Sequence, residues 1–122
     1  MNRHHGLNYL ELAACDLAAT RAFFETVLGW QFQDYGPDYQ AFSDGVMEGG
    51  FYRAPQGQCS RSEQGAALPV FYSDDLQATL DAVQRAGGHI VKAIDDFPGG
   101  RRFHFFEPSG NEFAVWSLPL KD

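Results

Sequence analysis

The sequence predicts an α+β fold of two β-α-β-β-β modules in tandem, forming a concave mixed sheet with helices on its outer face. The main observation is an internal repeat, in which Asp16, Leu17, Ala19, Thr20 and Gly29 recur as Asp75, Leu76, Ala78, Thr79 and Gly88. Such a repeat indicates a duplicated supersecondary unit. The second observation is the change from a strand period of two to a helical period within the first copy. The chain has 122 residues, of which 44% are hydrophobic, so both copies fit in one compact domain.

The first module begins with a strand and a helix. A strand is predicted from residue 8 to residue 14, because Leu10, Leu12 and Ala14 alternate with the residues between them. Asp16 can cap the following helix by accepting hydrogen bonds from its exposed backbone N–H groups. Gly29 can end that helix, because glycine readily adopts the left-handed conformation found after the last helical turn. The apolar face of the helix consists of Leu17, Phe24, Val27 and Leu28.

Three strands complete the first module, at residues 30–34, 39–43 and 46–52. The turns between them are Gly36-Pro37-Asp38 and the tight hairpin signal Asp44-Gly45. Residues 54–65 are polar and rich in Gly, Gln and Ser, which predicts a linker to the second copy.

The second module repeats the same order of elements. Strands are predicted at residues 68–72, 89–94, 101–106 and 111–117, with turns at 97–100 and 107–110. The helix begins after the cap Asp75 and closes at Gly87-Gly88, and its apolar face is Leu76, Leu80 and Val83. We therefore expect a single domain at 7–118, made of modules 7–53 and 66–118 with the linker 54–65.

Alternation divides the strands between two faces. The helix-facing side carries Leu10, Leu12, Ala14, Phe103, Phe105, Phe113 and Val115. The opposite face carries Tyr9, Glu11, Ala13, Leu68, Val70, Tyr72, Arg102, His104, Phe106, Glu112, Ala114 and Trp116. This mixture of aromatic side chains and a few polar groups is typical of a small-molecule cavity rather than of a solvated sheet.

Composition excludes some partners. The net charge of −7 repels phosphate backbones, so neither nucleic acid nor an anionic membrane is expected as a partner. The two cysteines, Cys15 and Cys59, form no disulfide framework, and the sequence contains no signal peptide or long apolar run. We therefore expect a reduced, cytoplasmic protein.

Two motifs carry a family resemblance. Residues 16–30 read Asp-Leu-x-x-Thr-x-x-Phe-Phe and end in Leu-Gly-Trp, and residues 107–112 read Glu-Pro-Ser-Gly-Asn-Glu. Over residues 7–118 the chain resembles the vicinal oxygen chelate superfamily, the group of glyoxalase I, bleomycin-resistance and fosfomycin-resistance proteins and extradiol dioxygenases. It looks most like the short bacterial glyoxalase-like proteins. The resemblance implies the βαβββ module already indicated by the repeat.

The resemblance also implies a divalent metal, held by His, Gln or Glu, that acts as a Lewis acid on two neighbouring substrate oxygens. Carried over by position, the ligands of the first strands fall on Tyr9 and Leu68, and those of the last strands on Gly49 and Ala114. Leu, Gly and Ala have no side-chain donor, and Tyr is only an occasional ligand. We therefore expect the usual metal site to be lost and no metal cofactor. If the alignment is shifted by one residue at Gly49, the ligand position falls on Glu48, but the other three positions remain without a suitable ligand.

Glu11 is the first candidate for acid–base chemistry. Its predicted place on the aromatic face would raise the pKa of the carboxyl, which suits a general acid or base. Alternatively, Glu11 is a structural partner of Arg102 or Tyr9.

His104 is the only histidine predicted on the cavity face, where it is a catalytic base, a ligand-binding group or a satisfied structural residue. Glu112 lies near Glu11 if the first and last strands occupy their family places. In that case Glu11, His104 and Glu112 are candidate ligands of a displaced metal. Alternatively, the Glu112 side chain points to solvent.

The remaining candidates bind rather than react. Arg102 attracts a carboxylate or enolate, or forms a solvated pair with Arg101. Cys15 lies near a helix N-terminus, but no His or Asn partner is predicted for it, so thiol catalysis is not expected. The predicted apolar wall is Leu68, Tyr72, Phe106 and Trp116.

These observations leave three functional hypotheses. The leading one is a metal-independent protein that binds a small organic ligand through Glu11, His104 and Tyr9. The second is a lyase, isomerase or dioxygenase that uses a relocated metal or acid–base catalysis by Glu11 and His104. The third is a sequestering protein that works through its dimer interface. The resemblance implies a homodimer in each case.

Overall fold

The chain folds in the predicted order of two β-α-β-β-β modules, and the computed structural model describes residues 2–120. The first module contains β1 (Tyr9–Ala14), α1 (Leu17–Leu28), β2 (Gln31–Asp34), β3 (Tyr39–Ser43) and β4 (Glu48–Arg53). The second contains β5 (Val70–Tyr72), α2 (Leu76–Arg85), β6 (His89–Phe97), β7 (Gly100–Phe106) and β8 (Glu112–Ser117). A short 3-10 helix, η1 (Ser62–Gln64), lies between the modules. Within residues 2–120, no helix is long and apolar enough to cross a membrane.

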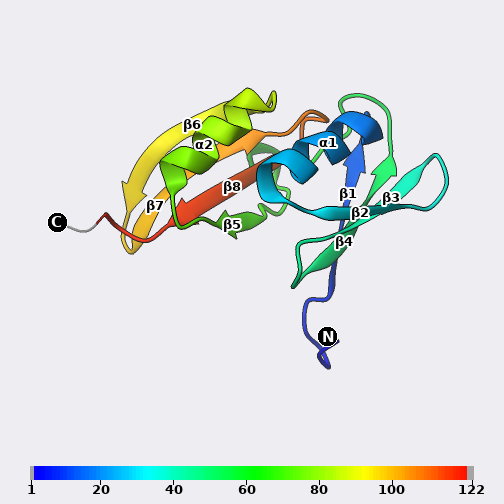
Figure 1. Cartoon of the computed structure of the whole chain (residues 1–122), viewed down its shortest axis with the longest axis horizontal. Helices are drawn as coiled ribbons and strands as arrows, with labels where there is room; N and C mark the ends of the chain where they lie inside the picture. Colours follow the sequence, from blue (N-terminus) through cyan, green and yellow to red (C-terminus); the bar gives the residue numbers. More distant parts are fainter. Residues whose placement is uncertain (1, 121–122) are drawn as a thin grey trace.

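Each module has its own four-stranded mixed sheet. The strand order is β1-β4-β3-β2 in the first sheet and β5-β8-β7-β6 in the second. The first strand of each module runs parallel to the last, and all other pairs are antiparallel. The registers correspond, since Glu11 pairs with Gly50 as Val70 pairs with Ala114. Figure 1 shows the two modules next to each other, with α2 beside the strands of the second module and α1 at the boundary between the modules.

The internal repeat is reproduced in the backbone of the two helix starts. Asp16 and Asp75 each accept a hydrogen bond from the N–H group three residues along, at 3.0 and 3.1 Å. Their φ and ψ angles are −136° and 89° for Asp16, and −138° and 91° for Asp75. Gly29 ends α1 in the left-handed region at φ 70°, as predicted. At the end of α2, that conformation falls on Gly87, at φ 94°, and not on Gly88.

One hydrophobic core joins the modules, and α1 packs against both sheets. The ring centroid of Phe23 lies 5.7 Å from that of Phe105, and that of Phe24 lies 5.3 Å from Phe113. Both partners belong to the second sheet. Trp30 stacks on the other side of the same core, 4.3 Å from Phe24. Because its aromatic face fills the boundary between the sheets, α1 packs on the second sheet as well as on its own four strands.

Several strand ends differ from the prediction. Seven residues predicted in strands precede them instead: Asn8, Trp30, Val46, Met47, Leu68, Pro69 and Asn111. The Asp44 carboxylate accepts from the backbone N–H groups of the next turn residues at 2.8 and 2.7 Å, which delays the start of β4. In contrast, β6 continues to Phe97, with register shifts against β7. The segment 54–65 is more than a plain linker, because it contains η1.

A buried polar cluster links the turn before β8 to α1. The Glu107 carboxylate accepts from the Thr20 hydroxyl at 2.7 Å and from the backbone N–H of Ser109 at 2.9 Å. It also accepts from the backbone N–H and the side-chain amide of Asn111, at 3.1 and 2.8 Å. The same amide donates to the carbonyl of Ala13 at 2.7 Å. Burial raises the pKa of Glu107, and the hydrogen bonds oppose that rise. The Glu-Pro-Ser-Gly-Asn motif is therefore a structural link between the modules.

Candidate functional site

The predicted site residues fall into two groups on the sheet faces opposite the helices. Tyr9 and Glu11 belong to β1 of the first sheet, whereas the others lie on or just before strands of the second sheet. Within the described residues, no hydrogen bond joins Glu11 to His104 or to Glu112. No group of three His, Cys, Asp or Glu side chains in residues 2–120 could hold a metal. The displaced metal site of Glu11, His104 and Glu112 is therefore not formed.

On the first sheet, Glu11 is held by two tyrosines. The Tyr39 hydroxyl donates to Glu11 Oε2 at 3.0 Å, and the hydroxyls of Tyr9 and Tyr39 share a short hydrogen bond. Because Tyr39 gives its single proton to the carboxylate, Tyr9 is the donor in the tyrosine pair. Burial raises the pKa of Tyr39, and its hydrogen bonds to Tyr9 and Glu11 raise it further. Tyr39 was not among the predicted residues, although it occupies an alternating position of its strand.

Glu11 is not enclosed as predicted. Its side chain is exposed, and Tyr9 is 39% exposed. The alternative partner Arg102 forms no hydrogen bond or ion pair with Glu11, which accepts from Tyr39 instead. Within one chain, the aromatic enclosure predicted around this carboxylate is therefore absent.

The predicted ligand position Gly49 is wrong by one residue. A Cβ atom at Gly49 would meet the Leu10 carbonyl and the Phe42 ring, which lie toward the helix side of the sheet. The residue equivalent to Ala114 is Gly50, because it pairs with β1 as Ala114 pairs with β5. A Cβ atom at Gly50 would overlap the hydroxyls of Tyr39 and Tyr9. The two tyrosines therefore occupy the space that a ligand side chain at this position would fill.

The superfamily's metal does not fit the residues present. After this correction its four ligand positions are Tyr9, Gly50, Leu68 and Ala114. Three of them carry no side-chain donor, and the fourth is a phenol that is already hydrogen-bonded to Tyr39. This donor set cannot hold a divalent ion in the way the superfamily does.

On the second sheet, His104 and Glu112 form a buried pair. His104 Nδ1 lies 2.7 Å from Glu112 Oε2, and both side chains are 4% exposed. Glu112 Oε1 accepts from the backbone N–H and the hydroxyl of Ser62, each at 2.7 Å. Burial raises the pKa of Glu112, but the hydrogen bonds from His104 and Ser62 outweigh it and hold the pKa below its ordinary value. Glu112 therefore does not point to solvent, which corrects that alternative.

The segment between the modules covers part of this face. The Arg61 guanidinium lies 3.8 Å above the ring of Phe106, and its Nε donates to the Gly110 carbonyl at 3.0 Å. Arg61 and Ser62 were predicted as part of a plain linker, and the structure places them against β7 and β8. The local sequence contains no signal for these contacts, because they join segments far apart in the chain.

The other predicted binding residues form an open strip. Tyr72 is 50% exposed, and its ring meets Trp116 edge-on with centroids 5.2 Å apart. Arg102 is exposed, and its guanidinium lies 5.7 Å from the Phe97 ring. Leu68 is half-buried just before β5. These side chains lie on one sheet face but do not enclose a cavity within one chain.

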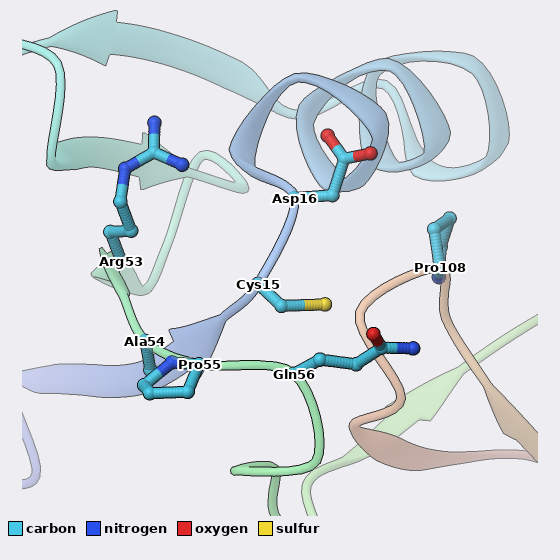
Figure 2. Close-up of a pocket in the computed structure, with 7 residues that line it drawn as sticks. All are labelled: Cys15, Asp16, Arg53, Ala54, Pro55, Gln56 and Pro108. Carbon is cyan, nitrogen blue, oxygen red and sulfur yellow. The ribbon is translucent and has the colours of Figure 1, made fainter.

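A cavity of about 730 Å³ lies at the start of α1, away from the predicted residues (Figure 2). Its lining consists of Cys15, Asp16, Arg53, Ala54, Pro55, Gln56 and Pro108. Figure 2 shows the Cys15 sulfur turned toward the side of Gln56 and Pro108. The thiol makes one weak contact, to the Ser109 carbonyl at 3.9 Å. It has no histidine beside it, so thiol catalysis gains no support here.

Comparison with known proteins gives a consistent family. The family model of the Glyoxalase/Bleomycin resistance protein/Dioxygenase superfamily matches residues 6–115. The anthracycline biosynthesis protein DnrV of Streptomyces peucetius is 30% identical over 124 residues, covering 88% of this chain and 45% of DnrV. The anthracycline biosynthesis protein DauV of Streptomyces sp. strain C5 matches with the same identity and the same coverage of both chains. The chain thus spans about half the length of these two curated relatives.

Solved structures agree on the fold. A glyoxalase/bleomycin resistance protein/dioxygenase family enzyme from Burkholderia phytofirmans superposes with a TM-score of 0.75 at 18% identity, covering 91% of this chain and 97% of the other. The fosfomycin resistance protein FosX from Mesorhizobium loti gives a TM-score of 0.76 at 15% identity, covering 95% and 94%. At these identities the likeness concerns the fold alone.

Proposed function

Because the chain belongs to the glyoxalase/bleomycin resistance protein/dioxygenase superfamily, we propose that it binds a small organic ligand on the sheet faces opposite its helices, without the superfamily's metal. The observation that carries this proposal is the network of Tyr9, Tyr39 and Glu11. The network stands where a metal ligand would stand, beside a glycine whose missing side chain leaves room for the two hydroxyls.

The network suits an organic ligand with hydrogen-bond donors. Glu11 Oε2 is fixed by Tyr39, whereas Oε1 has no partner among the described residues. A carboxylate oriented in this way accepts a hydrogen bond from a ligand O–H or N–H at little further cost in side-chain entropy. Because Glu11 and Tyr9 are exposed, a ligand reaches them directly.

The second sheet offers apolar contact area. Val70, Tyr72 and Phe97 are 45%, 50% and 38% exposed, and Trp116 lies against Tyr72. A shallow cavity of about 360 Å³ also lies where β5 approaches the first module, lined by Val70 and Tyr72 together with Trp30 and other residues. Exposed aromatic side chains at this density support binding of a flat, partly aromatic ligand.

The curated relatives suggest where a search for the ligand should begin. DnrV and DauV are named for anthracycline biosynthesis. Anthracyclines and their aromatic precursors are therefore the first compounds to screen, and the identity of the natural ligand follows from that screen.

We also propose that the protein is a homodimer. Large apolar side chains on the strand faces are exposed in the single chain, and a second copy would cover them and help to enclose the ligand. Sedimentation at micromolar concentration tests this, and a single species at the monomer mass of 13.6 kDa would contradict it. The free thiols of Cys15 and Cys59 support the proposed reduced, cytoplasmic setting.

A thermal-shift screen followed by titration calorimetry tests the binding site on the first sheet. Glu11→Gln removes the charge but keeps the shape of the side chain, so the melting temperature should hold or rise while affinity for the screened ligand falls. Glu25→Gln, at an exposed glutamate of α1 that also makes one side-chain hydrogen bond, is the matched control and should leave affinity unchanged. Loss of stability in Glu11→Gln with affinity intact would show that Glu11 is part of the scaffold.

A further inference from the structure

The second sheet holds a carboxylate–imidazole pair that the proposed site on the first sheet does not use. Both oxygens of Glu112 are occupied, one by His104 Nδ1 and the other by Ser62. A carboxylate in this position accepts hydrogen bonds, so the proton between the pair lies on Nδ1 of the imidazole. The lone pair of the neutral ring is then on Nε2.

The Nε2 atom of His104 is buried and has no hydrogen-bond partner among the described residues. Buried polar atoms are nearly always paired, and one left unpaired is costly. Nε2 is the ring nitrogen farther from Cβ, and His104 alternates with the core residues Phe103 and Phe105. The lone pair therefore points off the sheet, toward the face on which the predicted ligand residues lie.

The charges around His104 favour an anion. Arg102 lies two residues along β7 on the same face, and Lys92 is the register partner of His104 on β6. Arg61 lies over the aromatic ring on the other side of His104 along β7. Apart from Glu112, the acidic group opposite this part of β7 is Asp95, the register partner of Arg102. This part of the sheet thus carries three cationic residues beside one engaged carboxylate and one exposed aspartate.

We propose that His104 accepts the proton of a weakly acidic hydroxyl, that of a phenol or an enol, in the ligand that this protein binds. This inference rests on the proposed function, since it names the chemical class of that ligand. The O–H bond of the ligand breaks, its proton bonds to Nε2, and the electron pair stays on the oxygen. Glu112 remains hydrogen-bonded to the imidazolium that forms, and Arg61 and Arg102 stabilise the phenolate or enolate.

The ligand reaches Nε2 when the segment around η1 moves aside. Arg61 and Ser62 contact Phe106 and Glu112, the two side chains next to His104 on this face. Residues 62–65 of this segment are exposed, so the cover here is one layer of chain. The Arg61 stacking and five hydrogen bonds hold it on this face, and these bonds join Ser60, Arg61 and Ser62 to Gly110, Asn111 and Glu112. These are the contacts that must break for a ligand to enter.

4-Nitrophenol is a suitable probe, because its phenolate and its phenol have different absorption spectra. Its methyl ether, 4-nitroanisole, has the same ring but no acidic proton. We expect the protein to bind 4-nitrophenol in the phenolate form, and to bind it about tenfold or more tightly than the ether, as expected of a hydrogen bond to a charged group. Equal binding of phenol and ether, or no binding of the phenol, would overturn the inference.

His104→Asn is the decisive variant. The Asn amide takes the place of Nδ1–H toward Glu112, while Nε2 is removed, so the fold should be kept and the preference for the phenol over the ether lost. Glu112→Gln should reduce the same preference without abolishing binding of the ether. His4→Asn is the matched control, because His4 is an exposed histidine that precedes β1 and lies outside both sheets, and it should change nothing. Thermal melts verify that each variant is folded, and an unchanged preference in His104→Asn would refute the proposal.

A ligand-free measurement separates this inference from the proposed function. The chain has four histidines, so long-range proton–nitrogen NMR spectra are simple, and His104→Asn identifies the signals of His104. In the neutral ring, we expect the proton on Nδ1 and the lone pair on Nε2. A proton on Nε2 of the neutral ring would overturn the inference and leave the site on the first sheet untouched. Conversely, a failure of the Glu11→Gln test would count against the first-sheet site alone.

Discussion

Thr20→Val tests the buried link between the modules, and the internal repeat supplies its control. The substitution nearly keeps the side-chain volume but removes the hydroxyl that donates to Glu107 at 2.7 Å. Thr20 is fully buried, so no water can replace the donor. Hydrogen bonds to charged groups contribute about 1.5–3 kcal/mol, and we therefore expect the free energy of unfolding to fall by about 2 kcal/mol.

Urea unfolding and calorimetry measure this loss. At about 2.1 cal/mol/K per residue, the entropy of unfolding of this chain is about 0.26 kcal/mol/K, so a loss of about 2 kcal/mol lowers the melting temperature by about 8 °C. The control is Thr79→Val at the equivalent position of α2, where the hydroxyl contacts Ser73 Oγ at 2.7 Å and donates to the Asp75 carbonyl at 3.2 Å. These partners are neutral and partly exposed, so this loss should stay below about 1 kcal/mol. Equal losses in both variants, or none in Thr20→Val, would refute the reasoning.

Three further predictions follow from the same structure. The pKa of Glu112 in the folded protein lies below 4.5, so the stability that Glu112 contributes is present above pH 4.5 and is lost as the pH falls through the folded pKa. The pKa of Glu107 in the folded protein lies above 4.5, so its contribution is present below pH 4.5 and is lost as the pH rises through the folded pKa. Urea titrations across this pH range should show that Glu112→Gln removes the loss of unfolding free energy at falling pH, and that Glu107→Gln removes the loss at rising pH. Reversed effects would contradict the assignments. Thermal melts with a chelator and with added nickel or zinc should coincide, because a metal that bound only the native state would raise its stability; a shift of several degrees would sink the metal-free proposal. Gly50→Ala should displace the tyrosine hydroxyls and weaken ligand affinity with the fold kept, whereas Gly49→Ala, whose Cβ meets backbone, should lower the melting temperature more; the reverse order would be inconsistent with the register.

The order of the elements could be predicted because it depends on short-range patterns. Asp16 and Asp75 cap their helices with nearly the same dihedral angles, since capping needs only a carboxylate and the N–H groups one turn along. The period of two that places Glu11 and His104 on the face away from the core is equally local. The exact ends of the strands could not be predicted, because side-chain contacts such as those of Asp44 determine where a strand begins.

The strand faces of the candidate residues could be predicted, but their grouping and the part of Tyr39 could not. The alternation placed Glu11, His104 and Glu112 on equivalent faces, yet the structure gives Glu11 to the tyrosines and pairs His104 with Glu112. Which residues of a face meet depends on strand order and on how the two sheets are set against each other. The one-residue error at Gly49 has the same origin, because the hairpin length does not determine the register of β4 against β1.

The sequence by itself determined the duplicated module, the capped helices and the two faces of each strand. These properties follow from residue type and from periods of a few residues, which act within one element. Only the tertiary structure decided that Phe23 and Phe24 pack across the module boundary, that Glu107 links the turn before β8 to α1, and that Arg61 and Ser62 cover the pair on the second sheet. These contacts join residues far apart in the chain, so they depend on how whole elements pack, which no local period encodes.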